Sequence, residues 1–352
     1  MPHRLSRDIT VMRSPVVVPA AITLIWTACS PTPERQEATA TAQSWEIRLY
    51  VADRYEGVLR LDPNSLAVLD TIQTGRRPHG LIVSPDRRWL YITVETSNEL
   101  LKVDVATDSI VARAKVGPVP NEPTISANGR YVFVPQRAGD QTDVVDTETM
   151  TVVTTLPVGR AQHNSYTSAD GRDVFVTSLD DSLIGVIDPE RLEIKRKIKP
   201  GGIPRVIALK RDGSSAFLTL SNLHGFAELD LKTDVTHQRV ELPVPPGTPR
   251  PLLDTYTHGI LLTPDERELW IASYGIDKVF AFTLPDFQPL ADLTVGQGPH
   301  WFTLHPAGEP LYVSIERAGS VAAIHRGLRV VQTVAKVGQA PTRILAFSLG
   351  GS

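Results

Sequence analysis

The sequence is poor in cysteine, since its 352 residues contain only Cys29. Without a second cysteine no intramolecular disulfide can form, so disulfides cannot be what stabilises the fold. The chain also lacks an excess of charge, because 36 lysines and arginines nearly balance 39 aspartates and glutamates and give a net charge of -3. No basic run stands out. The electrostatic pattern of a nucleic-acid-binding protein is missing, and we expect no nucleic-acid partner.

Helical periodicity and the common catalytic motifs are missing as well. Beyond residue 29, no stretch of ten residues places its apolar positions at the spacing of a helix. The sequence has no glycine-rich phosphate loop, no nucleophile elbow and no cysteine pair at metal-binding spacing. Any functional site must therefore be sought in residues that the fold brings together.

What the sequence does contain is a repeat of about 42 residues. Each copy reads as a strand, a short polar turn and a second strand with an aromatic anchor, as in residues 299–315. Successive anchors are 41 or 42 positions apart, except for one interval of 53 positions that carries an insertion. The anchors are Tyr50, Tyr91, Phe133, Phe175, Phe217, Trp270 and Tyr312.

Seven units of four short strands predict an all-β, seven-bladed β-propeller with antiparallel strands in each blade. The chain ends predict how the ring closes. Residues 341–347 read as the first strand of a unit, but no second strand follows them. Residues 47–51 read as the second strand of a unit, but no first strand precedes them. Joining three N-terminal strands with one C-terminal strand completes the seventh blade and removes a free sheet edge. Aspartates such as Asp104 and Asp188 recur after the third strand and are expected to start turns.

The units resemble the YVTN-type β-propeller repeat family, whose members carry a Gly-x-x-Pro-His-Gly motif, a Ser-Pro-Asp-Gly turn and a Tyr-Val-Thr-Asn strand. This sequence has matching segments at residues 75–80, 84–86 and 312–314, although the family asparagine is missing. The resemblance covers residues 45–349. It implies the propeller fold and an extracytoplasmic setting, and it says little about function because the family includes surface proteins, cofactor-binding domains and enzymes.

The first 29 residues read as an export signal. Three arginines precede an apolar stretch at residues 15–28, which is shorter than the ~20 residues that span a bilayer. The end of this stretch, Thr27-Ala28-Cys29, resembles the lipobox of bacterial lipoproteins, in which the cysteine becomes the lipidated first residue. We therefore expect lipidation at Cys29, a membrane anchor and a location on the periplasmic side of the cell envelope, at the outer membrane rather than the inner one. A plain secretory signal is the alternative.

Residues 30–44 contain almost no large apolar side chain, and such a segment cannot bury enough surface to fold. The expected organisation is therefore a signal peptide at 1–29, a flexible tether at 30–44 and a propeller at 45–349. We expect the propeller to be monomeric.

The candidate site follows from the register of the repeat. Counting back twelve positions from each anchor gives one residue at the start of each innermost strand, where a propeller places its central channel. Four of the nine histidines in the chain occupy these equivalent positions. The residues are His79, Asn121, His163, Arg205, His258 and His300, with Thr342 at the matching place in the closing blade.

Two functions and one structural role suit this ring. Imidazoles that converge on an axis can hold Zn, Cu or Fe, or they can bind an anionic ligand together with Arg205 and Asn121. Glu122 is a further ligand-binding candidate because it follows Asn121. Alternatively, a histidine after proline simply caps the strand and packs over the channel.

The insertion at residues 240–256 contains five prolines and is expected to be a stiff loop on the same face as the histidines. Its candidate ligand-binding residue is Tyr256, with Arg250 and Asp254 nearby in sequence. The loop is then a wall or lid of the channel mouth, or else a tolerated surface insertion.

Three functions remain. The first is an envelope protein that binds a metal ion or a small anionic ligand at the channel mouth or serves as a scaffold for a protein partner. The second is a metal-dependent lactonase or lyase. The third is a redox accessory protein that holds copper or an iron cofactor.

Overall fold

The computed structural model describes residues 46–249, 251, 253 and 255–350. The predicted signal segment, the predicted lipidation site Cys29 and the predicted tether lie outside these residues. The propeller range belongs to one compact unit, Trp45–Ser352. All regular elements of the described residues are β-strands, and none of these residues forms a helix long and apolar enough to cross a membrane.

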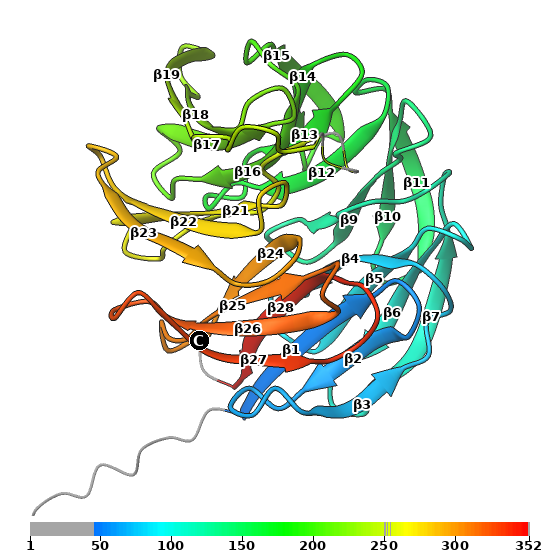
Figure 1. Ribbon diagram of the computed structural model, residues 1–352. Helices are drawn as coiled ribbons and strands as arrows, with labels where there is room; N and C mark the ends of the chain where they lie inside the picture. The colour runs from blue at the N-terminus through cyan, green and yellow to red at the C-terminus, as the bar shows by residue number, and fades with distance from the viewer. Residues whose placement is uncertain (1–45, 250, 252, 254, 351–352) are drawn as a thin grey trace, which may run out of the picture. The chain divides into compact units, whose positions relative to one another are not determined.

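The strands form seven four-stranded antiparallel sheets that are arranged as the blades of a ring (Figure 1). Six blades use four consecutive strands each. The first three of these blades comprise β4 (Pro78–Val83), β5 (Trp89–Val94), β6 (Glu99–Asp104) and β7 (Ser109–Lys115); β8 (Thr124–Ile125), β9 (Tyr131–Pro135), β10 (Thr142–Asp146) and β11 (Thr151–Leu156); and β12 (Gln162–Thr167), β13 (Val174–Ser178), β14 (Leu183–Asp188) and β15 (Glu193–Ile198).

The next three blades follow the same order. They comprise β16 (Pro204–Leu209), β17 (Ser215–Leu220), β18 (Gly225–Asp230) and β19 (Val235–Glu241); β20 (Ile260–Leu262), β21 (Glu268–Ser273), β22 (Lys278–Thr283) and β23 (Pro289–Thr294); and β24 (Pro299–Leu304), β25 (Leu311–Ile315), β26 (Ser320–His325) and β27 (Val330–Lys336).

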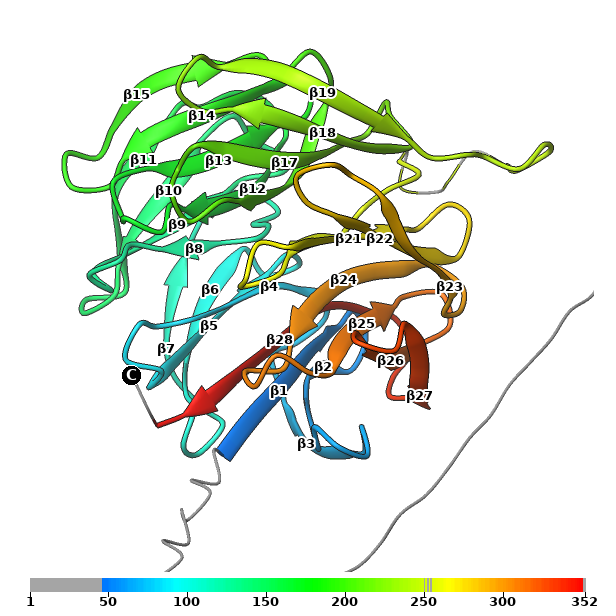
Figure 2. The ribbon, with the colours of Figure 1, turned by 90° about the vertical axis from the view of Figure 1, so that its left-hand side faces the viewer.

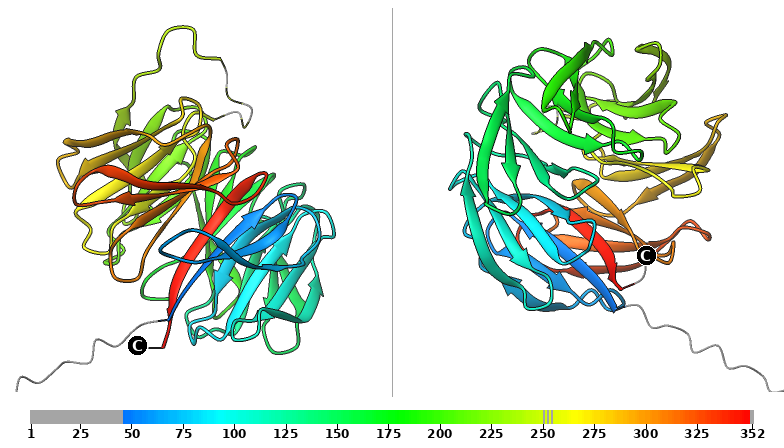
Figure 3. Two further views of the ribbon diagram at one scale, coloured as in Figure 1. Left: turned by 60° about the horizontal axis from the view of Figure 1, so that its bottom comes forward. Right: turned by 180° about the vertical axis from the view of Figure 1, so that it is seen from behind.

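The remaining blade closes the ring with both ends of the chain. Its strand order is β28-β1-β2-β3, with β28 (Pro341–Leu349) hydrogen-bonded to β1 (Glu46–Asp53), followed by β2 (Gly57–Leu61) and β3 (Val68–Ile72). The first and last strands lie side by side in every view (Figures 2 and 3). The predicted blade number and the predicted closure are both confirmed.

Burial within a blade is greatest in the second strand and least in the fourth. The second strands are almost wholly buried, as in β13 and β25, because they are covered by neighbouring blades on both faces. The fourth strands alternate between half-buried and exposed residues, as in β27, because only one face packs against a neighbour. The seven aromatic anchors all lie in second strands and are at most 2% exposed. They therefore fix the register of each blade in the ring.

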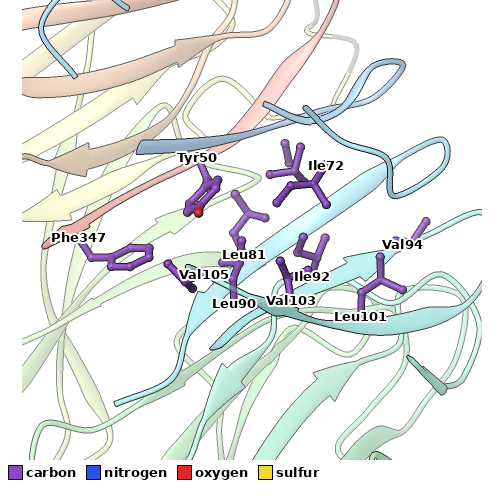
Figure 4. Close-up of a cluster of buried hydrophobic side chains, with 12 residues drawn as sticks. Tyr50, Ile72, Leu81, Leu90, Ile92, Val94, Leu101, Val103, Val105 and Phe347 are labelled. Atoms are coloured by element: carbon purple, nitrogen blue, oxygen red, sulfur yellow. The ribbon is translucent and has the colours of Figure 1, made fainter. Parts of the chain in front are cut away.

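The hydrophobic core lies between the blades, as Figure 4 shows for the closing blade and the next one. Tyr50 of β1 and Phe347 of β28 contribute to the same buried cluster as Leu90 and Ile92 of β5. Burying a side chain of this size is worth about 1.5–3 kcal/mol. The closing seam is therefore stabilised by apolar packing as well as by the β1–β28 ladder.

The recurring aspartates have the turn-forming role that the sequence predicts. Oδ1 of Asp104 accepts hydrogen bonds from the backbone N–H groups of Ala106 and Thr107. Oδ1 of Asp188 accepts equivalent bonds from Glu190 and Arg191. These bonds lower the pKa of Asp188 below its ordinary value and satisfy the turn at the rim, so the aspartates are structural.

Candidate functional site

Five of the seven innermost strands turn two consecutive residues towards the centre of the ring because they carry a β-bulge. In the pair β4–β5, Pro78 faces Val94 and Leu81 faces Ile92, so that two residues of β4, His79 and Gly80, oppose a single residue of β5. The same shift occurs at the start of β12, β16, β24 and β28. The centre of the ring, which we call the hub, is therefore lined by two layers of residues.

The first layer is the one that the repeat predicts. All of its members are buried, with 5% or less of each exposed. They are His79, Asn121, His163, Arg205, His258, His300 and Thr342.

The structure brings the four histidines of this layer (His79, His163, His258 and His300, the hub histidines) into a continuous series of ring contacts. The centroids of His79 and His163 are 6.4 Å apart, and those of His163 and His258 are 6.0 Å apart, in edge-to-face arrangements. The rings of His258 and His300 are stacked at 3.9 Å. Residues that are far apart in the chain therefore form one polar cluster at the hub.

Burial and neighbouring arginines keep the hub histidines neutral. Burial is the largest cause and lowers the pKa of all four well below the ordinary value. Arg343 adds to this effect on the pKa of His79 and His300, and Arg205 adds to it on the pKa of His163. Arg343 and Arg205 therefore place positive charge beside the cluster, while the carboxylates of Glu95 and Glu316 lie 3.3 and 3.7 Å from His79 and His300.

Hydrogen bonds define the state of two of these rings. Nε2 of His163 accepts from Nη1 of Arg205 at 3.2 Å, because a guanidinium can only donate. Nδ1 of His300 donates to the carbonyl of Thr342 at 2.9 Å. Nδ1 of His79 lies 3.3 Å from Oε1 of Glu95 without forming a hydrogen bond, and Nε2 of His79 is also buried without a partner. The charge of Glu95 favours a proton on Nδ1 of His79, which leaves an uncommitted lone pair on Nε2.

The second layer contains the residue that the sequence analysis missed. Arg343, only 1% exposed, follows Thr342 and extends from the closing blade into the hub. Its Nε donates to Oε2 of Glu122 at 2.6 Å, and its guanidinium carbon lies 4.0 Å from the ring centroid of Trp301. Nη1 lies 3.2 Å from Nδ1 of His300, and Nη2 is buried without a hydrogen-bond partner. Arg343 is therefore the central charge of the hub.

Glycine at position 80 allows a close approach of neighbouring innermost strands. A Cβ atom at Gly80 would lie 2.1 Å from Cδ of Pro123 and 2.8 Å from Cα of Glu122, so no larger residue fits there. The strands are equally close on the other side, where Glu122 forms a parallel bridge with Asn164. The missing side chain therefore lets β4 lie against the segment that carries Glu122.

A further ring of charged residues comes from the ends of the second strands, four positions after the anchors. Glu95 pairs with Arg77 at 2.6 Å, and Glu316 pairs with Arg54 at 2.9 Å. Arg137 occupies the same position after β9, and burial lowers its pKa while Glu95 opposes that shift. The repeat register already indicates Glu95, Arg137 and Glu316 as members of one ring. The structure shows that these groups contribute charge beside the hub histidines.

A cavity of about 360 Å³ adjoins the second layer, within the 300–1,000 Å³ typical of small-molecule sites. Glu122 and Arg343 line it together with Trp301 and Tyr166, and most of the remaining lining is apolar. We call it the hub cavity. The sequence points to the histidine side of the hub, whereas this cavity is reached from the second layer.

A comparison with models of protein families identifies the family of the chain. The model of the YNCE-like β-propeller family matches residues 41–245. The chain belongs to this family. No curated protein sequence matches the chain.

Solved structures share the fold of this YNCE-like propeller at low sequence identity. The periplasmic gluconolactonase of Pseudomonas aeruginosa is 19% identical, with a TM-score of 0.70 over 86% of this chain and 99% of that one. A functionally unknown protein from Desulfotomaculum acetoxidans is 11% identical, with a TM-score of 0.71 over 86% and 98%. Kuenenia stuttgartiensis hydrazine synthase is 17% identical, with a TM-score of 0.64 over 76% and 86%. At these identities the likeness shows the fold alone.

The insertion of the YNCE-like propeller is anchored beside the hub. The segment after β19 stands out from the blades (Figure 3), and the chain then returns so that the carbonyl of Leu253 accepts from Nη2 of Arg205 at 3.2 Å. The ring of Tyr256 contacts His224 at 5.4 Å, and Tyr256 also packs against Gly275. Arg250 and Asp254 lie outside the described residues. The insertion thus supplies a backbone acceptor to Arg205, while Tyr256 packs on the neighbouring hairpin.

The hub of the YNCE-like propeller suits an anion better than a metal ion. Among the described residues, no group of three or more His, Cys, Asp or Glu is placed to hold one ion. His258 and His300 are stacked, so the lone pairs in their ring planes do not converge on one point. Arg343 and Arg205 add positive charge next to these rings. A cation would be opposed by this field.

Proposed function

We propose that the protein is an extracytoplasmic binding protein that holds a small organic anion at the hub, with Arg343 as the residue that receives the negative charge. The observation that carries the proposal is the buried guanidinium at the end of the hub cavity, with Nη2 uncommitted. A buried donor without a partner is costly, and a carboxylate satisfies it with a charge-assisted hydrogen bond.

The charge on Glu122 does not remove this preference. Glu122 balances Arg343 through the Nε contact alone, and Arg54, Arg137 and Arg205 also act on the hub histidines. A further uncommitted donor of the hub is Nδ2 of Asn121, whose Oδ1 already accepts from the backbone of Glu122. Acceptors such as Oε1 of Glu95 and Oε2 of Glu316 are uncommitted as well, so the preference for a carboxylate rests on the charge and the uncommitted Nη2 of Arg343.

The test is calorimetric titration of the purified protein with benzoate and with benzamide, which have the same ring but differ in charge. We expect benzoate to bind at least tenfold more tightly, because only the carboxylate offers a charge to Arg343. Arg343→Gln should remove this difference. Arg172→Gln is the control, because the side chain of Arg172 is 81% exposed and distant from the cavity lining. Equal binding of the two compounds would refute the proposal.

The location of the protein in the cell is part of the same proposal. We propose that Cys29 is lipidated and holds the protein on the periplasmic side of the envelope, at the outer membrane. The order of residues 27–29 and the absence of a second cysteine support it. Cell fractionation of the wild type and Cys29→Ala tests it, since the wild type should partition with membranes and the variant should be released. The same distribution for both would contradict the lipid anchor.

A second candidate is hydrolysis of a lactone or another ester, with His79 as general base. The contact between Nδ1 of His79 and Glu95 orients the imidazole and leaves Nε2 uncommitted, which is the arrangement of a carboxylate-supported base. Turnover of gluconolactone or of p-nitrophenyl acetate, lost in His79→Gln and retained in the exposed variant His237→Gln, would support it. Turnover unaffected by His79→Gln would exclude this role.

The metal and redox hypotheses of the sequence analysis remain predictions with a direct test. Zn, Cu and Fe can be measured by elemental analysis of protein purified without a histidine tag, and copper or an iron cofactor can be detected by visible absorption. A stoichiometric metal that is lost in His163→Gln would favour the metal site over the anion. A metal content far below stoichiometric would agree with the positive charge of Arg343 and Arg205 at the hub.

A further inference from the structure

The walls of the hub cavity decide what kind of anion fits, since most of their hydroxyl groups are already committed. Oγ of Ser165 donates to the carbonyl of Glu122 at 3.0 Å, and Oγ1 of Thr167 donates to the carbonyl of Ile125 at 2.8 Å. Oγ1 of Thr124 lies 2.9 Å from Oγ1 of Thr167, whose proton is used, so Thr124 is the donor of that pair. None of these three hydroxyls retains a proton for a ligand.

Two other hydroxyls of the lining also have partners. Oγ1 of Thr303 accepts from the backbone N–H of Ala346 at 2.9 Å, and the hydroxyl of Tyr166 accepts from Nδ2 of Asn164 at 2.6 Å. Each of these groups keeps one O–H that can donate. Beyond the ion pair of Glu122 and Arg343, the cavity therefore offers a ligand about two hydroxyl donors.

The rest of the lining is apolar and comes from several blades. Its members include Leu81, Ile82, Leu209, Phe302, Ile344 and Leu345. Trp301 adds an aromatic wall, one face of which is occupied by the guanidinium of Arg343. The part of a ligand that lies against these walls loses its water, and the guanidinium offers it a charged donor.

We propose that the ligand is a monocarboxylate with an apolar ring or chain as its body, and not a polyhydroxylated sugar acid. This inference rests on the proposed function, because it takes Arg343 as the group that binds the carboxylate. A sugar acid brings four or five hydroxyls, and those that lie against the apolar walls would be buried without partners. Each such hydroxyl costs about tenfold in affinity. An alicyclic or aromatic body gains affinity from the same walls.

The test uses two ligands that each carry one carboxylate on a six-membered ring, the apolar cyclohexanecarboxylate and the hydroxylated pyranose galacturonate. Both are titrated calorimetrically into the intact protein. We expect cyclohexanecarboxylate to bind at least tenfold more tightly. Arg343→Lys, which keeps the charge but loses the planar donor pair, should weaken its binding at least fivefold. Circular dichroism confirms that the variant remains folded, and Arg172→Lys serves as the matched surface control.

The outcomes separate the inference from the function on which it rests. Galacturonate binding as tightly as cyclohexanecarboxylate, or more tightly, with both weakened by Arg343→Lys, would overturn the ligand class and leave the anion site intact. Failure of both carboxylates to bind would overturn the proposed function and this inference together. In a third outcome, Arg343→Lys binds cyclohexanecarboxylate as tightly as the wild type does. The apolar walls would then bind the body of the ligand while Arg343 does not bind its carboxylate. This result would also overturn the inference.

Discussion

Nε of Arg343 donates a hydrogen bond of 2.6 Å to Oε2 of Glu122, although the two residues are 221 positions apart and belong to different blades. The side chain of Arg343 is 1% exposed and that of Glu122 is 10% exposed. Burial raises the pKa of Glu122, and the charge of Arg343 opposes that shift. The pair therefore links the closing blade to the blade of β8–β11 through the centre of the ring.

Removing one member of this pair should be costly. In Arg343→Met the carboxylate of Glu122 loses its countercharge, and we expect the free energy of unfolding to fall by about 3–5 kcal/mol at pH 8. The loss should be smaller near pH 5, where Glu122 can take a proton, because a raised folded-state pKa favours the folded state at low pH. Urea unfolding of the wild type and the variant at both pH values measures this loss of unfolding free energy.

The double variant Arg343→Met/Glu122→Leu is the matched control for that prediction. Because it removes both charges, we expect it to recover most of the lost stability. The exposed pair of Arg172 and Asp170 gives a second comparison, since Arg172→Gln should change stability by about 0.5 kcal/mol or less. A double variant as unstable as the single one would show that the ion pair is not the cause.

Acid should destabilise the protein through the hub histidines. Their folded-state pKa values lie well below 6.5, so below that pH the unfolded chain binds more protons than the folded one. The stability contributed by keeping them neutral is complete above pH 6.5 and is lost as the pH falls. The four histidines act together, and Glu122 acts in the opposite direction. We therefore expect the free energy of unfolding to fall by about 4 kcal/mol per pH unit just below pH 6.

Single variants assign this slope to the hub. In His258→Gln the slope of unfolding free energy against pH should fall by about 1.4 kcal/mol per unit, because one proton fewer is linked to unfolding. His237, whose side chain is 56% exposed, provides the control His237→Gln, in which we expect an unchanged slope. An equal effect of both substitutions would remove the hub histidines as the source. Urea midpoints between pH 5 and 8 give the slopes.

Gly80→Ala should disturb the centre of the ring. The added methyl group would lie 2.1 Å from Cδ of Pro123 and 2.9 Å from the carbonyl oxygen of Asn121, so the innermost strands must separate. We expect a loss of about 1–3 kcal/mol, as for overpacking in other cores. Gly327→Ala is the control, since its Cβ would meet only the flexible end of Glu309 at 3.1 Å. Thermal unfolding compares the two, and equal losses would contradict the role of Gly80.

A chain that ends after Ala340 should fail to form a stable ring. It lacks β28, which leaves one edge of β1 without its ladder and exposes the cluster of Tyr50 and Leu90. We expect aggregation and loss of cooperative unfolding, measured by size-exclusion chromatography and calorimetry. A chain that ends after Gly350 keeps every strand and should behave as the full protein does. A monomeric, cooperatively folding product of the shorter chain would contradict the closure role.

The fold was predictable from the sequence because the repeat carries it. The spacing of the aromatic anchors sets the blade number, and unpaired strands at the two ends predict the closing blade, both of which the structure confirms. The same register placed seven residues around the hub, where the structure finds them. A repeat of this kind can be read directly from the sequence, without any knowledge of side-chain packing.

Arg343 was not predictable in the same way. The register counts one hub residue per blade, whereas each bulge turns two residues inward, and Arg343 is the second of its pair. The signal that could have found it is the position next to the predicted ring, where Glu122 also stands. The hub cavity depends on how Arg343, Trp301 and Tyr166 pack together, and that packing is not encoded in the spacing of the repeat.

The location of Arg343 in β28 ties closure of the ring to the charge at its centre. β28 pairs with β1, the first strand of the described residues, so the two ends of the propeller meet only when β28 docks. Sealing of the ring and delivery of the central guanidinium are therefore one event. A folding intermediate with β28 undocked lacks both, and Glu122 then has no countercharge from Arg343.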